Sequence, residues 1–218
     1  MDKQNLLKKM NKTTFDKIYE NYLAEIAGLD FESIKNQLGI EVDNDEAVIN
    51  FFGFSYRVSP KGIKDPSGKR PSHAISVVLC KYMLLCPEND PAQKDWVSYK
   101  DFRDAAPFVG GFVNNSQVPI AEKFSGRLGM LEKAGKMLGG CSPDIDLTYE
   151  LSMKFDALPK VPILMLFNDE DDEFPAQTSL LFEKRAEKYL DMECLAIIGW
   201  SLYELLIEIT ENSKGTLI

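Results

Sequence analysis

The chain of 218 residues lacks several features that would identify its chemistry. It has a single histidine, His73, and the spacings of its four cysteines match neither a zinc site nor a redox pair. No apolar run reaches the ~18 residues that a membrane-spanning helix needs, and no cationic segment followed by an apolar core opens the chain. We therefore expect a cytoplasmic protein that does not cross a membrane and whose thiols stay reduced.

Positive charge is also scarce. The sequence has 25 Lys and Arg against 34 Asp and Glu, which gives a formal net charge of −9. Nucleic-acid binding depends on Lys and Arg that displace counterions from phosphates, so this balance argues against a nucleic-acid partner. It favours cationic partners. A phosphate-binding loop is missing as well, because five residues separate Gly62 from Gly68 where the motif has four, and Arg70 replaces its Ser or Thr.

What the chain does contain is typical of a folded globule. Hydrophobic residues make up 44% of it and aromatic residues 11%. The length suits a single domain, residues 1–218, in which we expect the polar and basic first dozen residues to be loose.

Amphipathic spacing predicts six helices. They run from Thr13 to Ile26, Phe31 to Leu38, His73 to Cys86, Pro119 to Leu138, Ala176 to Leu190 and Met192 to Thr210. Glycines inside the fourth either allow close approach of another backbone or break the helix. The last is apolar nearly all round, which predicts a buried C-terminal helix.

Extended segments form two groups, about residues 47–58 and 147–167. The first bends at Gly53, and the second pairs an alternating strand with a continuous apolar one. Helices come before, between and after the two groups. This order predicts an α+β domain with an antiparallel or mixed sheet covered by helices.

The most distinctive stretch is an acidic turn, residues 168–173. It joins the apolar run Pro162 to Phe167 to Asn168 and five consecutive carboxylates, and Pro175 follows. Proline is favoured at the first position of a helix, and a helix N-terminus favours negative charge. The pattern therefore predicts a strand, an acidic turn and a helix.

Three interpretations of the acidic turn stay open. The acids cap and solvate a helix start, they dock a basic partner, or they bind Mg²⁺, Mn²⁺ or Ca²⁺, which prefer oxygen ligands. The spacing is not that of an EF-hand loop. The candidate metal ligands are Asn168, Asp169, Asp171, Asp172 and Glu173.

A second candidate is the aromatic segment that begins at Trp96, which either wraps the core or lines a pocket. Its candidate ligand- or partner-binding residues are Trp96, Tyr99, Asp101 and Phe102. His73 joins them, because the dipole at a helix start keeps an imidazole neutral and able to ligate or to accept a proton. A lone histidine at a helix start is more often an ordinary surface residue.

Several of these stretches together resemble a known family. Residues 162–177 and 181–196, the aromatic residues around Gly53, the helix around Tyr82 and residues 96–102 are similar to an uncharacterised bacterial and archaeal family, the domain of unknown function 3786. The resemblance implies an anaerobic cytoplasm and brings no activity. Some members carry an added iron–sulfur domain, and no such cluster is expected here because the chain has no cysteine cluster.

No nucleophile and base pair can be identified, so the leading hypothesis is a non-catalytic accessory protein of anaerobic metabolism. It would bind a small ligand, a cofactor or a basic protein partner. The alternatives are a divalent-metal-dependent enzyme that uses the acidic turn and a structural subunit of a complex.

Overall fold

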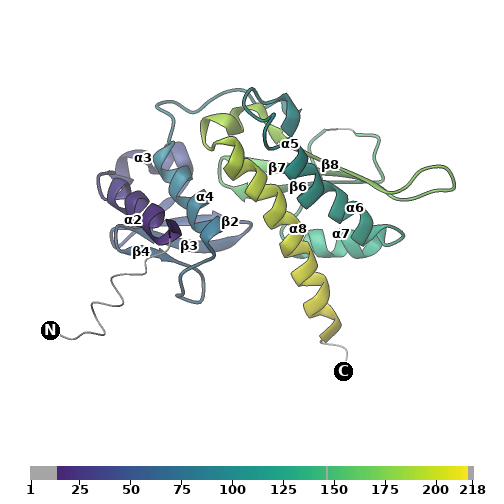
Figure 1. Ribbon diagram of the computed structural model, residues 1–218, viewed down its shortest axis with the longest axis horizontal. Helices are drawn as coiled ribbons and strands as arrows, with labels where there is room; N and C mark the ends of the chain where they lie inside the picture. Colours follow the sequence, from purple (N-terminus) through teal and green to yellow (C-terminus); the bar gives the residue numbers. More distant parts are fainter. Residues whose placement is uncertain (1–13, 146, 216–218) are drawn as a thin grey trace.

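The computed structural model describes residues 14–145 and 147–215, with side chains in the last helix up to Asn212. The prediction that the first dozen residues are loose lies outside these residues. Helices and antiparallel strands are both abundant, which confirms the α+β class. The two predicted strand groups do not join, and each belongs to a four-stranded antiparallel sheet of its own (Figure 1).

From Thr14 onward, where the structure describes it, the N-terminal half is a meander of four strands with three helices. Asp30 caps one of these helices, and the αL residue Gly39 ends it. The elements are α2 (Thr14–Ile26), α3 (Phe31–Leu38), β1 (Glu41–Asp43), β2 (Glu46–Phe51), β3 (Phe54–Ser59), β4 (Gly62–Lys64) and α4 (His73–Leu84).

Two tight hairpin turns shape this first sheet. Asn44 and Asp45 join β1 to β2 with φ of 51° and 61°, a left-handed pair that Asn and Asp tolerate better than most residues. Phe52 and Gly53 join β2 to β3 with φ of 49° and 80°. The predicted bend at Gly53 is confirmed, and its unusual member is the buried, non-glycine Phe52.

The C-terminal half builds the second sheet in the order β5-β8-β7-β6. Its strands are β5 (Trp96–Ser98), β6 (Leu151–Leu158), β7 (Val161–Asn168) and β8 (Gln177–Glu183). β6 and β7 form the predicted hairpin, although β6 starts at Leu151 rather than at Leu147. β7 is buried at every residue from Val161 to Phe167.

Helices cover this sheet. They are α5 (Val109–Phe112), α6 (Val118–Phe124), α7 (Leu128–Met137) and α8 (Met192–Gly215), and a π-helical turn (Val113–Gln117) joins α5 to α6. The predicted helix from Pro119 to Leu138 is broken at Gly126, which has φ of 67°. The long α8 contacts α4, α5 and α7 (Figure 1), and its buried side chains confirm the buried C-terminal helix.

The prediction of a helix from Ala176 to Leu190 is wrong. That stretch forms β8, which pairs with β7 along its length, and then a short 3-10 turn (Lys184–Lys188). A strand buried on both faces must satisfy its backbone on both edges, and β8 supplies the second partner of β7. Pro175 therefore precedes a strand, and the acidic turn is a hairpin loop.

The two sheets meet at an inter-sheet joint. The hydroxyl of Tyr82 in α4 donates a hydrogen bond to the carbonyl of Leu38 (2.5 Å) and accepts one from the N–H of Lys160 (3.1 Å). The N–H of Phe52 donates to the carbonyl of Ala157 in β6 (3.0 Å). One buried hydrophobic cluster includes side chains from both sheets.

Candidate functional site

The aromatic segment that begins at Trp96 lies mostly in the core. Tyr99 is 2% exposed, its ring stacks on Phe112 at 4.2 Å, and its hydroxyl donates to the carbonyl of Met192 (2.6 Å). Phe102 is 3% exposed. Trp96 is half-buried at the edge of the second sheet, where it pairs with Glu183. These contacts bury the ring faces that a ligand would need.

A 3-10 turn, Tyr99–Asp101, follows Ser98, whose side chain makes no capping bond there. Asp101 is exposed. The residues just beyond Phe102 do line a cavity of about 660 Å³, to which Arg103, Asp104 and Phe108 contribute. Its charged lining is mixed in sign, with Lys184, Lys188, Asp191 and Glu193 among the other residues.

His73 is separate from this segment. It is the first residue of α4, and its ring centroid lies 4.4 Å from that of Phe15 in α2. Its Nδ1 is buried without a hydrogen-bond partner. No hydrogen bond, ion pair or ring contact described for the chain joins His73 to Trp96 or to the acidic turn.

The acidic turn uses its side chains to hold its own backbone. Asp169 Oδ1 accepts hydrogen bonds from the N–H groups of Gly126 (2.7 Å) and Glu170 (2.9 Å), which ties the loop to the break between α6 and α7. Asn168 Oδ1 accepts from the N–H of Glu150 (3.2 Å), and the Glu150 carboxylate accepts from the N–H of Asp169. Asn168 and Asp169 are therefore occupied.

Asp171 completes the loop. Its Oδ1 accepts from the N–H groups of Glu173 (2.8 Å) and Phe174 (2.7 Å), and these bonds hold the pKa of Asp171 below its ordinary value. Glu170, Asp172 and Glu173 stay exposed at the tip, and Phe174 beside them is 60% exposed. Within residues 14–145 and 147–215, no three His, Cys, Asp or Glu side chains lie together as a metal site requires. The acidic turn is therefore a loop whose own side chains cap its backbone.

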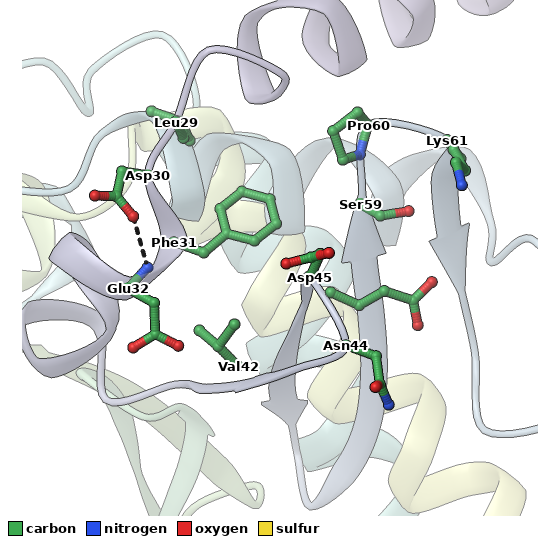
Figure 2. Close-up of a pocket in the computed structure, with 11 residues that line it drawn as sticks. Leu29, Asp30, Phe31, Glu32, Val42, Asn44, Asp45, Ser59, Pro60 and Lys61 are labelled. Atoms are coloured by element: carbon green, nitrogen blue, oxygen red, sulfur yellow. Dashed lines mark hydrogen bonds between the residues drawn. The ribbon is translucent and has the colours of Figure 1, made fainter.

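A pocket that sequence reasoning missed lies in the first sheet (Figure 2). We call it the α3 pocket; its volume is about 540 Å³, within the usual range for small-ligand sites. It is lined by Leu29, Asp30, Phe31, Glu32, Val42, Asn44, Asp45, Glu46, Ser59, Pro60 and Lys61. Three segments line it: the start of α3, the β1–β2 turn and the β3–β4 turn.

The acids of the α3 pocket differ in what they contact. Asp30 caps α3 through the N–H of Glu32 (3.1 Å), Glu32 pairs with Lys35 (2.6 Å), and Glu46 pairs with Lys64 (3.3 Å).

Asp45 has no hydrogen bond or ion pair with any residue that the structure describes. In Figure 2 its carboxylate and the Phe31 ring point into the same space, whereas Asp30 and Glu32 point away from it.

The pocket combines an apolar floor with a free carboxylate, which are parts of a binding site. Phe31, at 9% exposure, Leu29 and Val42 form the floor beside Asp45. The one hydroxyl in the lining, Ser59 Oγ, donates to the carbonyl of Gly62 (3.2 Å). His73 packs on Phe15 and is not among the lining residues.

The sequence carries a signal for one of the turns that line this pocket. An Asn-Asp pair between two short extended segments indicates a two-residue hairpin turn, because both residues tolerate positive φ. That turn places Asp45 opposite the start of α3. Neither residue forms a recognisable motif with Phe31, so the pocket itself could not be inferred.

Comparison with known proteins places the chain in a family. Residues 30–204 match the family model described as a domain of unknown function, DUF3786. The chain belongs to this family. The DUF3786 match includes the α3 pocket from Asp30 onward, the segment that begins at Trp96 and the acidic turn. Searches of the curated proteins and of the solved structures gave no match.

The family match carries no activity, so function must be argued from the geometry of this DUF3786 chain. One further finding concerns membranes. Within the part of the chain that the structure describes, no helix is both long and apolar enough to span a bilayer.

Proposed function

We propose that this protein is a non-catalytic binding protein whose α3 pocket receives a positively charged side chain, Lys or Arg, of a protein partner. The observation that carries the proposal is the free carboxylate of Asp45 beside the Phe31 ring. A cation on an aliphatic stem satisfies both groups, because the stem covers apolar surface while the charge meets the carboxylate and the ring face.

The charge of the whole chain supports this partner. A net charge of −9 attracts a basic surface at long range and speeds its encounter. The exposed acids at the tip of the acidic turn add to that field. We infer that the protein acts in the cytoplasm as an accessory protein of anaerobic metabolism. Its four free cysteines support a reducing compartment, and the anaerobic setting rests on the family resemblance.

The test is a titration of isotope-labelled protein with N-acetyl-lysine amide and with N-acetyl-norleucine amide, followed by NMR. The two probes share an aliphatic stem and differ in the ammonium group. We expect saturable shifts of the amide signals of residues 30–32 and 42–46, with the lysine probe bound about fivefold more tightly, which corresponds to a partly exposed ion pair of ~1 kcal/mol.

Two variants make the test specific. Asp45→Asn should lower the affinity for the lysine probe to that for the norleucine probe. Asp101→Asn, which removes an exposed carboxylate outside the pocket, should leave it unchanged. If the lysine probe shifts residues 168–174 instead, or binds the Asp45 variant as well as the parent, the pocket is not the binding site.

A further inference from the structure

A second cluster of charge lies where residues 85–95 connect α4 to β5 without regular secondary structure. Asp90, near the middle of this segment, meets three donors. Lys160 Nζ lies 2.9 Å from Oδ2, Arg185 Nη1 lies 3.3 Å from Oδ1, and the Tyr189 hydroxyl donates to Oδ1 at 2.7 Å. We call the three donors the Asp90 cradle.

The donors and the acceptor differ in burial. The side chain of Arg185 is 9% exposed and that of Lys160 is 20% exposed, and Tyr189 is fully buried. The side chain of Asp90 is 50% exposed. A half-exposed carboxylate thus lies against a largely buried, cationic recess, which the three donors form.

Contacts other than Asp90 hold the cradle in shape. The Nε of Arg185 donates to Glu183, whose side chain is 12% exposed. The ring of Tyr189 packs against Tyr82, with 6.0 Å between the centroids. The recess is therefore organised before any anion enters it, which lowers the entropic cost of binding one.

The balance of charge shows that the recess requires an anion. Arg185 and Lys160 bring two positive charges, and Glu183 offsets one of them. Without Asp90, a buried cation would lack a counterion, which is strongly unfavourable. Proteins bind carboxylate and phosphate groups with guanidinium, ammonium and phenol donors that converge on the oxygens of the anion.

The segment that carries Asp90 is anchored on both sides of that residue. At its start, Cys86 packs against the hydrophobic core. At its end, the carbonyl of Gln93 accepts the N–H of Arg185 (2.9 Å), and that of Asp95 accepts the N–H of Lys184 (2.8 Å). Among the hydrogen bonds and ion pairs described for residues 87–92, those to the cradle are made by the Asp90 carboxylate, so replacing that carboxylate would loosen these residues while leaving both anchors intact.

We propose that Lys160, Arg185 and Tyr189 form an oxyanion-binding site that the chain's own Asp90 occupies, and that an external carboxylate or phosphate group, by taking its place, releases residues 87–92. Asp90 competes as a tethered group at an effective concentration of roughly millimolar or more. The site is therefore largely masked in the parent and open when the Asp90 charge is removed. This proposal is independent of the α3 pocket, which takes the opposite charge.

The first experiment compares melting curves of the Asp90→Asn variant in phosphate and in chloride at equal ionic strength. We expect phosphate to raise the midpoint of the variant by at least about 3 °C in a saturable manner, and to raise that of the parent by less. Adding Lys160→Met should abolish the response. Acetate in place of phosphate distinguishes a carboxylate site from a phosphate site.

The matched control is Asp43→Asn. Asp43 is 49% exposed and pairs with Arg57 at 2.9 Å, but that arginine is 43% exposed, so no buried cation is left behind. The melting midpoint of Asp43→Asn should rise no more in phosphate than in chloride. If Asp90→Asn responds to phosphate no more than to chloride, the cradle is a structural ion pair and the proposal fails.

The second experiment needs no variant. Backbone 15N relaxation of the parent is measured with increasing phosphate or acetate. The heteronuclear NOE of the Glu88, Asn89, Asp90 and Ala92 amides should fall as the anion saturates, while that of β7 stays unchanged. An unchanged NOE at these four amides at a saturating anion concentration would overturn the release step.

Discussion

The sharpest test of the fold is Tyr82→Phe at the inter-sheet joint. The substitution keeps the buried ring and removes only the hydroxyl, which serves the carbonyl of Leu38 and the N–H of Lys160. Each backbone group left without a partner lowers the free energy of unfolding by about 1–3 kcal/mol. The N–H of Lys160 should contribute less than the carbonyl of Leu38, because it is only partly buried. We therefore expect a loss of about 3 kcal/mol in the free energy of unfolding.

For a chain of this length that loss corresponds to a fall of roughly 6–12 °C in the melting midpoint. Urea unfolding of the parent, of Tyr82→Phe and of Tyr149→Phe gives the measurement. Tyr149 is 39% exposed, so its variant should stay within about 0.5 kcal/mol of the parent. A Tyr82 variant as stable as the parent would refute the reasoning. Two separate transitions in that variant would show that the joint makes the two sheets unfold together.

Three further predictions concern other parts of the molecule. Gly199→Ala in α8 places a Cβ 2.5 Å from the Phe112 ring, so overpacking should outweigh the gain in helix propensity and lower stability by about 1–2 kcal/mol in urea unfolding. Lys160 and Tyr189 hold the pKa of Asp90 below its ordinary value. The stability that the Asp90 charge adds is therefore fully present above pH ~4, the pKa of this carboxyl in the unfolded chain. The difference in free energy of unfolding between the parent and Asp90→Asn should shrink as pH falls through the pKa that Asp90 has in the folded chain. Millimolar Mg²⁺, Mn²⁺ or Ca²⁺ should leave the melting midpoint within about 1 °C of its value without the cation. A saturable rise that Asp171→Asn removes would instead support a metal site at the acidic turn.

The elements that were predicted correctly carry their own local signals. The helix from Phe31 to Leu38 has a capping Asp30 and a terminal Gly39, and both act as expected. Ser72 accepts from the N–H of Ile75 at the start of α4. Such signals depend on neighbours in sequence, so they can be inferred without knowing what packs against the element.

The sequence predicts a helix in place of β8 because its apolar residues fit both the helical and the strand period. Leu180, Leu181 and Ala186 fit a helical face, whereas Thr178, Leu180 and Phe182 alternate along the strand and are more buried than Ser179 and Leu181 between them. A short apolar run does not distinguish the two patterns. Pairing with β7 across the acidic turn makes this stretch a strand, and that pairing cannot be inferred from the stretch itself. The α3 pocket and the Asp90 cradle could not be inferred because they join residues from separate segments of the chain.

The strand order of the two sheets also fixes the order in which the chain can fold during synthesis. The first sheet is a meander of neighbours, so all its strands are available once Lys64 has been made. In the second sheet, β5 waits for β8, which begins only at Gln177, and α8 follows last. Every residue that lines the α3 pocket precedes Gly62. The part of the chain that we propose meets a partner is therefore the part that the ribosome releases in foldable form first.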